Sequence, residues 1–386
     1  MVNNMKYQRK CKIDNVVYEL VNNHYVASGY YGNDSIITIH NRIYDLPVKS
    51  IRKYSFRFND NIKELIIEDG VKEIGEYAFN KCNNLEIVKI SNSVLNINEY
   101  AFSECINLKS VELSNSISDI ANGLFCNCYK LNDIKIPEGV NRIGKSSFYN
   151  CNSLEKIDLP NTLEIIGETA FNMCYSIKDL TLPRSLKIIN KNAFFNCIGI
   201  KYVIIPESVI EIGTWSFNCV AMYSEGNILF NEECNIGRKI YYNINIENLF
   251  IDQNFHYILD NESKDAVISH YCGEEKNVII PEVVLYNNEI YKVKVIDTKS
   301  FWCNKEVNSI RISKGIREIR KEAFDGCSSL HEVFIPESVV IIEDGAIDGN
   351  ESLVVYCERD IQPDSWNLYW TWNLEAEVIM GFSVNI

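Results

Sequence analysis

Residues 154–174 read LEKIDLPNTLEIIGETAFNMC, and this stretch is one period of a pattern that runs through most of the chain. The pattern is marked by a phenylalanine that returns every 23 residues, at Phe56, Phe79, Phe102, Phe125, Phe148, Phe171, Phe194 and Phe217. It resumes at Phe301 and Phe324, with Ile347 in the next slot. A fixed period of about 20 to 50 residues is typical of stacked repeats, so the pattern predicts a solenoid.

Other residue types recur in the same register. Three residues after the phenylalanine comes a cysteine, at Cys82, Cys105, Cys128, Cys151, Cys174 and Cys197. Aliphatic residues recur six, nine and eleven positions after it, and again eight and five positions before the next one. The positions nine and eleven residues after the phenylalanine predict a short β-strand, because residues two apart share one face of a strand. In the later repeats a proline follows and ends this strand.

A second tight bend is expected in each repeat where glycine recurs, at Gly75, Gly144, Gly167 and Gly213. One repeat is thereby predicted to be one coil of the solenoid. The coil contains a strand, a turn, a second short strand or turn, and a brief helical turn that carries the phenylalanine and the cysteine.

This pattern resembles the BspA-like leucine-rich-repeat family, whose unit reads roughly L-x-x-I-x-I-P-x-x-V-x-x-I-G-x-x-A-F-x-x-C. Residues 154–174 match nearly every fixed position of that unit, and the resemblance covers about residues 33–222 and 273–381. It implies a curved, right-handed leucine-rich-repeat solenoid, α/β by the usual classification but β-rich with only short helical turns. It also implies a role in protein–protein or surface recognition.

The solenoid is expected to form two arms, because a similar preamble leads into Phe56 and into Phe301. Val48 and Val293 both precede their phenylalanine by eight positions. Each preamble is expected to be a β-rich cap over the first coil's edge. The expected domains are residues 1–55 as an N-terminal β cap, 56–222 as the first arm, 223–300 as an insert that starts the second arm, 301–352 as the second arm, and 353–386 as a C-terminal cap.

Three local features of these segments carry expectations of their own. Asn287 and Asn288 are expected to form a hairpin turn, since asparagine tolerates positive φ. Residues 219–256 alternate like a hairpin and are expected to close the first arm. Near the C-terminus, three tryptophans are expected to cover the open end of the core, with an aromatic sugar-binding cleft as the alternative: Trp366, Trp370 and Trp372.

Composition narrows the partners and the location. The chain has 386 residues and a formal net charge of −14, which argues against nucleic acid and anionic membrane as partners. The first 20 residues lack the apolar core of a secretory signal, and no stretch is long and apolar enough to span a bilayer. The prediction is a cytoplasmic protein with reduced cysteines, and the cell surface is the alternative.

The sequence contains no recognisable catalytic or cofactor motif, so no enzyme, cofactor or metal site is predicted. A row of identical thiols could suggest metal binding, but it lacks tetrahedral closure and histidine partners. Cys126 precedes the row cysteine Cys128 by two residues and is expected at the surface or in a turn. His270, Cys272 and Glu274 could form a thiol–imidazole pair on one strand face, but a structural role is favoured.

The predicted function is a non-enzymatic scaffold that binds a protein partner on the concave strand face. The alternative is an adhesin-like structural protein of the cell surface, exported without a recognisable signal. The contact residues are expected eight and ten positions after each phenylalanine of the first arm, where strand side chains point away from the core. They are Glu64, Ile66, Ile87, Lys89, Glu112, Asp133, Lys135, Lys156, Asp158, Asp179, Thr181, Tyr202 and Ile204, with Ser110 in the same row.

Overall fold

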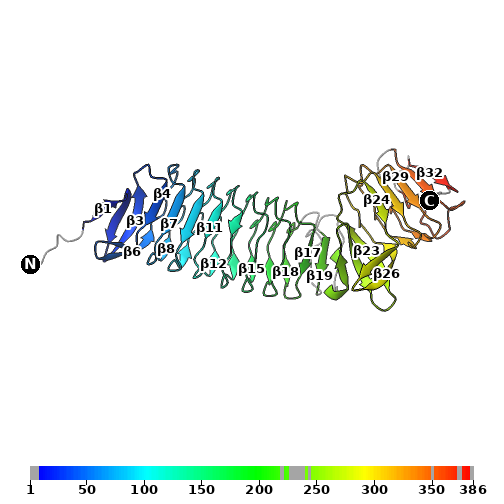
Figure 1. Ribbon diagram of the computed structural model, residues 1–386, viewed down its shortest axis with the longest axis horizontal. Helices are drawn as coiled ribbons and strands as arrows, with labels where there is room; N and C mark the ends of the chain where they lie inside the picture. Colours follow the sequence, from blue (N-terminus) through cyan, green and yellow to red (C-terminus); the bar gives the residue numbers. More distant parts are fainter. Residues whose placement is uncertain are drawn as a thin grey trace, which may run out of the picture. The chain divides into compact units, whose positions relative to one another are not determined.

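The computed structural model describes residues 8–217, 221–225, 240–241, 245–348, 352–371 and 376–382. The chain divides into two compact units: the first holds residues 1–220 and 226–236, and the second holds residues 221–225 and 237–386. Each unit consists of short strands that follow one another along the stack (Figure 1). Within the described ranges the helical content is one 3₁₀ turn, η2 (Ile246–Asn248). The predicted solenoid is confirmed, whereas the division into caps and arms stays a prediction.

In the first unit the expected strand follows Phe56, Phe79, Phe102, Phe125 and Phe194, whereas after Phe148 and Phe171 only an isolated bridge forms, between Lys156 and Asp179. Four parallel strands and β4 form a sheet in the order β13-β11-β9-β7-β4, and β17 occupies the same position in a later coil. Along β7, Leu65 and Ile67 are buried while Glu64 and Ile66 are partly exposed. The bounds are β4 Ile36–Ile39, β7 Glu64–Ile67, β9 Ile87–Ile90, β11 Ser110–Glu112, β13 Asp133–Ile134 and β17 Tyr202–Ile205.

A second short strand forms in each coil, as expected. These strands pair in parallel from coil to coil in two runs, β8 with β10 and β12 through β18, so that Ile143 lies beside Ile166 and Ile166 beside Ile189. Gly167 follows one of them, and a Cβ there would lie 2.6 Å from the carbonyl carbon of Gly144. The glycine is needed because adjacent coils approach backbone to backbone. The bounds are β8 Glu73–Ile74, β10 Asn96–Ile97, β12 Asp119–Ile120, β14 Arg142–Ile143, β15 Ile165–Ile166, β16 Ile188–Ile189 and β18 Glu211–Ile212.

The segment around each phenylalanine differs from the brief helical turn expected there. It is a chain of tight turns in which the residues two before and two after the phenylalanine are left-handed, such as Tyr77 (φ 52°) and Lys81 (φ 60°) around Phe79. A left-handed non-glycine residue costs about 1 kcal/mol, but the alternation turns every second N–H toward the next coil. The N–H of Phe79 donates to the carbonyl of Ala101 at 2.8 Å. A third hydrogen-bond ladder therefore replaces the helical turn.

The phenylalanine side chains stack along the core of the first unit. All eight, from Phe56 to Phe217, are at most 2% exposed. Neighbouring ring centroids lie between 4.8 and 6.1 Å apart. The row predicted from the sequence is thus a continuous aromatic stack, and each ring packs against one in the coil before and one in the coil after.

An antiparallel meander precedes the first coil. β1 (Lys10–Ile13), β2 (Val16–Val21) and β3 (His24–Tyr30) pair in order, and β3 then pairs in parallel with β6 (Leu46–Ile51). β5 (Arg42–Ile43) forms a hairpin with β6. The meander is thereby continuous with the second-strand ladder, which begins with β8.

His40 fastens this meander to the first coil. Its Nε2 lies 2.8 Å from Asp14 in the β1–β2 turn, and its Nδ1 lies 3.2 Å from Glu68, which follows β7. Burial alone would lower the pKa of His40, but the hydrogen bonds and charges of the two carboxylates outweigh it and raise the pKa above 6.5.

We expect His40→Gln to destabilise the first unit more at about pH 5.5 than at about pH 8.5. A raised histidine pKa contributes stability that is fully present below the unfolded-state value and is lost as pH rises through the folded-state value. Urea denaturation of wild type and variant at both pH values measures the difference. His24→Gln, a histidine change outside this bridge, is the matched control. An equal effect of His40→Gln at both pH values would contradict the bridge.

The second unit repeats the arrangement of the first. Its meander and second-strand ladder have the order β21-β22-β23-β26-β28-β30, with β25 paired to β26, and β19 pairs in parallel with β20. The bounds are β19 Ala221–Ser224, β20 Ile240–Tyr241, β21 Leu249–Ile251, β22 Phe255–Asp260, β23 Asp265–Tyr271, β25 Val283–Tyr286, β26 Glu289–Ile296, β28 Glu318–Ile319 and β30 Ile341–Ile342. In this unit β27 Ser309–Ile312 follows Phe301 and β29 Glu332–Ile335 follows Phe324. They form a parallel sheet with β24 Asn277–Ile280, β31 Val354–Cys357 and β32 Glu377–Met380, in the order β24-β27-β29-β31-β32.

The hairpin expected in the second unit is confirmed, whereas the tryptophan cap stays a prediction. Asn287 (φ 49°) and Asn288 (φ 62°) form the two-residue turn of the β25–β26 hairpin. Trp366 and Trp370 are each 3% exposed and belong to the core. Burial removes both rings from any sugar-binding surface. Trp372 and half of residues 219–256 lie outside the described residues.

Candidate functional site

The candidate site is the outward face of the strands that follow each phenylalanine, which we call the strand face. In the first unit its side chains stand in two rows, because Glu64, Ile87, Ser110 and Asp133 lie in register on neighbouring strands. All the predicted contact residues are partly or fully exposed, so the predicted orientation is confirmed. Their role in binding stays a prediction.

Much of the charge on this face is satisfied internally. Lys89 lies 2.8 Å from Glu64, and this carboxylate raises the pKa of the lysine. Lys156 lies 2.9 Å from Asp158. Exposed pairs of this kind contribute little to stability, because solvent screens them, so their main effect is on the charge pattern of the surface. The apolar contacts that remain for a partner are Ile66, Ile87, Tyr202 and Ile204.

The strand face of the second unit carries stronger candidates, which the sequence analysis did not name. Arg311, Phe334 and Tyr356 lie in register on β27, β29 and β31. Arg311 and Phe334 are ten positions after Phe301 and Phe324, so the offset used for the first arm would have found them. Aromatic and arginine side chains are the commonest anchors of protein interfaces.

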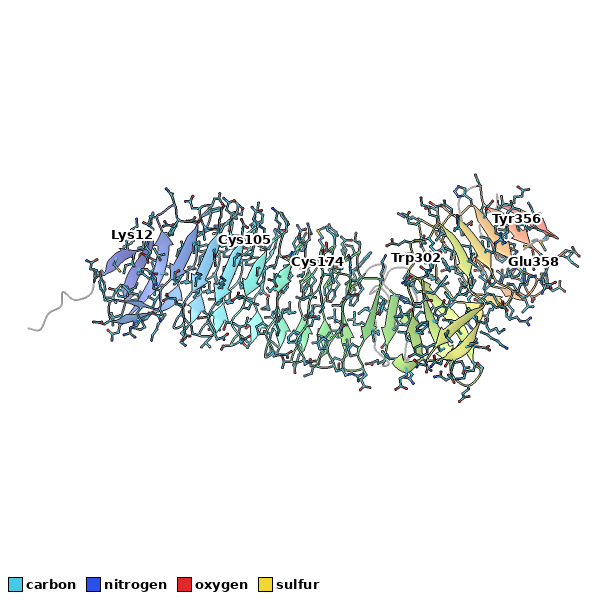
Figure 2. All side chains as sticks on the ribbon, viewed as in Figure 1. Lys12, Cys105, Cys174, Trp302, Tyr356 and Glu358 are labelled. Carbon is cyan, nitrogen blue, oxygen red and sulfur yellow. The ribbon has the colours of Figure 1, made fainter. Side chains whose placement is uncertain are left out.

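These side chains border a pocket beside the C-terminal ends of the strands. The rings of Phe334 and Tyr356 stack at 4.8 Å, and Phe382 packs on Tyr356 at 4.7 Å. The pocket is also lined by Ile312, Ile335, Pro336, Ser313, Glu282, Lys314 and Glu358. Figure 2 labels Tyr356 and Glu358 among the side chains of this unit. We call this the aromatic pocket.

The ladder cysteines have a structural partner that the sequence did not reveal. The Sγ of Cys151 donates to the carbonyl of Phe125 at 3.2 Å, and the other row cysteines do the same to the phenylalanine 26 residues before them. Burial raises the pKa of the Cys151 thiol well above its ordinary value. No group of three His, Cys, Asp or Glu among the described residues is placed to hold a metal ion.

We expect the ladder thiols to resist alkylation in the folded protein. Only the thiolate reacts, and burial both raises the pKa and blocks access. Iodoacetamide labelling followed by mass spectrometry should modify the exposed Cys303 first and Cys151 only after unfolding in urea. Cys126 is half-buried, and burial raises its pKa to about 11, so it should react slowly. Equal labelling rates for Cys151 and Cys303 would contradict the buried ladder.

His270 and Cys272, the two members of the possible thiol–imidazole pair, lie in different surroundings. His270 is buried in β23 and its ring lies against that of His256, with centroids 5.0 Å apart. Cys272 follows the last residue of the strand, and its Sγ lies 3.6 Å from the carbonyl of Gln253. The two side chains thus have separate packing partners, as a structural role requires.

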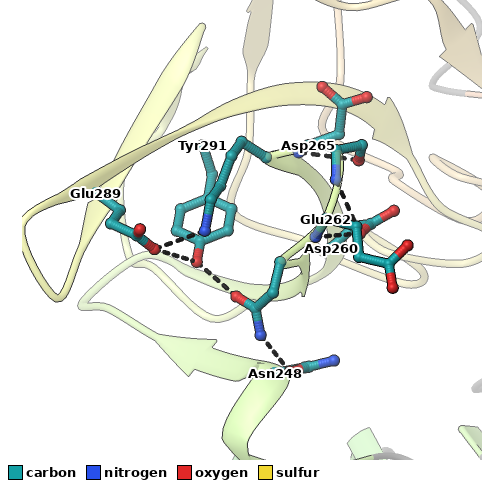
Figure 3. Close-up of polar contacts among 9 residues, drawn as sticks. Asn248, Asp260, Glu262, Asp265, Glu289 and Tyr291 are labelled. Atoms are coloured by element: carbon teal, nitrogen blue, oxygen red, sulfur yellow. Dashed lines mark hydrogen bonds and ion pairs between the residues drawn. The ribbon is translucent and has the colours of Figure 1, made fainter.

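A polar cluster joins the β22–β23 turn to the β25–β26 hairpin (Figure 3). The Lys264 Nζ lies 2.7 Å from Glu289 Oε2, and the Tyr291 hydroxyl donates to Asn261 at 2.6 Å. Asp260 accepts the backbone N–H of Glu262 at 2.9 Å. These polar groups are hydrogen-bonded or ion-paired with one another across the turn and the hairpin. We therefore interpret the cluster as a structural contact and not as a catalytic or binding site.

Stacked parallel coils with three backbone ladders define a solenoid repeat protein. A family model described as a BspA type leucine rich repeat region (6 copies) matches residues 49–160, 141–265 and 276–356. The chain therefore belongs to the BspA-type leucine-rich-repeat family, as the sequence pattern predicts.

Solved structures show the same likeness. A leucine-rich repeat protein from Bacteroides ovatus is 25% identical with a TM-score of 0.54, covering 96% of this chain and 91% of that one. The T. pallidum leucine-rich repeat protein is 22% identical with a TM-score of 0.46, covering 50% of this chain and 90% of that one. A leucine-rich cell surface protein from Faecalibacterium prausnitzii is 21% identical with a TM-score of 0.44, covering 98% and 96%.

A search of curated proteins finds no match. Among the described residues, no helix has the length and apolar character needed to cross a membrane.

Proposed function

We propose that this protein is a non-enzymatic interaction scaffold that binds a protein partner along its strand face. One observation carries the proposal: in both units buried and outward residues alternate along strands of this face, as they do on β7 and β9 and on β27, β29 and β31. Successive side chains of one outward row stand about 4.8 Å apart, which is the spacing of neighbouring strands. A partner can thereby contact many coils at once without disturbing the core.

The strand faces of the two units differ in the side chains that they offer to a partner. The first unit offers a broad, mixed-charge surface in which Lys89 and Lys156 already have carboxylate partners. The second unit offers Arg311, Phe334 and Tyr356 beside a pocket. Interface energy concentrates in a few aromatic and arginine anchors inside a polar rim. We therefore expect the strongest individual contacts on the strand face of the second unit.

Affinity capture from native cells tests the proposal. The wild-type chain is compared with a Lys89/Lys135/Tyr202 triple alanine variant and with an Arg311→Gln variant. A matched control replaces Lys72, Lys145 and Tyr149, which lie away from the strand face. Loss of the same captured protein with either strand-face variant, but not with the control, supports the scaffold. Identical capture by all four proteins contradicts it.

The proposal includes the cytoplasm as the location. Its support is the row of buried cysteines, which need their S–H to donate to the phenylalanine carbonyls, and thiols persist in a reducing compartment. Fractionation of native cells tests this point. Recovery with the cell envelope would favour the surface-protein alternative.

A further inference from the structure

The aromatic pocket offers ring edges rather than ring faces. β27 and β31 flank β29 on opposite sides, so Arg311 and Tyr356 cover the two faces of Phe334. The Arg311 guanidinium carbon lies 4.8 Å from the Phe334 ring centre, and the Tyr356 ring is nearly parallel to it at 9°. Phe382 covers Tyr356 at an angle of 48°. A sugar needs a free ring face, whereas an apolar side chain packs well against ring edges and the aliphatic floor.

Arg311 is the cation that this pocket leaves available. Its side chain is exposed and makes no ion pair or hydrogen bond with any other residue that the structure describes. Stacking on Phe334 restricts the guanidinium while leaving its in-plane N–H donors accessible. A guanidinium held in this way is preorganised for the two oxygens of a carboxylate.

Three other charged residues line the pocket and affect how well a carboxylate can bind to Arg311. Lys314 Nζ lies 4.0 Å from Glu358 Oε1, and Glu358 Oε2 also accepts the backbone N–H of Glu337 at 3.1 Å. The charge of Glu358 is thus largely offset within the protein. Glu282 lies exposed in the pocket lining and repels an anion, so it opposes Arg311. The bound carboxylate should therefore prefer the Arg311 side of the pocket.

We propose that the aromatic pocket binds a partner segment in which a large apolar side chain is followed by an acidic residue. The apolar side chain packs against the ring edges of Phe334, Tyr356 and Phe382, and the carboxylate pairs with Arg311. This inference rests on the proposed scaffold function and specifies the chemistry of its partner at one position.

Four blocked tetrapeptides test the proposal on the full chain: acetyl-Gly-Phe-Glu-Gly-amide and its versions with Gln or Lys in place of Glu, or Ala in place of Phe. Binding is followed by saturation-transfer NMR and by titration. The Glu peptide should bind about two- to fivefold more tightly than the Gln peptide, which corresponds to one exposed ion pair. The Lys peptide should bind more weakly still. The Ala peptide should lose about tenfold or more, because the apolar anchor is missing.

Three variants tie the effect to the pocket. Arg311→Gln is a surface change that should leave folding intact and abolish the preference for Glu over Gln. Arg42→Gln, an exposed arginine of the first unit, is the matched control and should keep it. Glu282→Gln should raise the affinity for the Glu peptide about twofold, since it removes a like charge.

Several results would overturn the proposal. They are binding of none of the peptides, equal binding of the Glu, Gln and Lys peptides, and a preference that survives Arg311→Gln. Self-association of the wild type that Arg311→Gln abolishes would place a second copy in the pocket and also overturn it. The capture experiment with the Lys89/Lys135/Tyr202 variant does not involve this pocket, so failure of the peptide test leaves the scaffold proposal independently testable.

Discussion

Phe148→Ala is expected to lower the free energy of unfolding of the first unit by about 3–5 kcal/mol. Phe148 is fully buried in the middle of the aromatic stack, with the rings of Phe125 and Phe171 at 5.5 and 5.1 Å. The cavity cannot close easily, because the backbone ladders fix the spacing of the coils. The Phe148 N–H itself donates to the Ala170 carbonyl at 2.8 Å. The loss should therefore fall toward the upper end of the range.

Native-state hydrogen exchange is the suitable measurement, since it reports each unit separately. Peptides from the coils around Phe148 should lose protection, and peptides from the second unit should not. Tyr149→Ala is the matched control, because Tyr149 is the next residue but is only half-buried. A loss for Phe148→Ala below about 1 kcal/mol, or equal to that of the control, would be inconsistent with a rigid stack.

The stack of phenylalanines could be predicted from the sequence because a strict period carries its own geometry. If every coil has the same length, Phe125, Phe148 and Phe171 must lie one above another. The strand alternation followed in the same way from Leu65 and Ile67.

Contacts between different rows could not be predicted, because the period does not say how one row is offset from another. The Cys151 thiol bonds to the carbonyl of Phe125, which belongs to the preceding coil, and only coordinates relate the two rows. The left-handed residues Tyr77 and Lys81 were hidden for a similar reason. Their conformation is stabilised by hydrogen bonds to the next coil rather than by local propensity.

In the candidate site, too, some features follow from the sequence period and others do not. The outward orientation of Lys89 and Tyr202 follows from strand periodicity alone. The aromatic pocket needs in addition the register of β27, β29 and β31 and the return of Phe382 onto Tyr356. Phe382 lies beyond the last repeat and belongs to no row, so no periodic argument places it.

An ion pair in the second unit, between the buried Asp297 and the partly exposed Arg320, gives the other large expected effect. Asp297 is 2% exposed, and its Oδ1 lies 3.0 Å from Arg320 Nη1 and accepts the Thr298 N–H at 2.8 Å. Its Oδ2 accepts the Tyr241 hydroxyl at 3.0 Å. Asp297 and Arg320 hold the same position in successive coils, four residues before Phe301 and Phe324. A carboxylate and a guanidinium thus lie one above the other where small residues stand in most coils of the first unit.

Arg320→Met should destabilise the second unit by about 3–5 kcal/mol, because it leaves the buried carboxylate of Asp297 without its counterion. Arg317→Met is the matched control: Arg317 is an exposed arginine of the same coil, and its change should stay within about 0.5 kcal/mol. Replacing both partners, as Asp297→Leu with Arg320→Met, should recover part of the loss, since a buried pair can be exchanged for apolar groups at little cost. Hydrogen exchange of the second unit measures all three proteins. If the double variant were no more stable than Arg320→Met alone, the loss would come from packing of the arginine stem, and the ion pair would not be its cause.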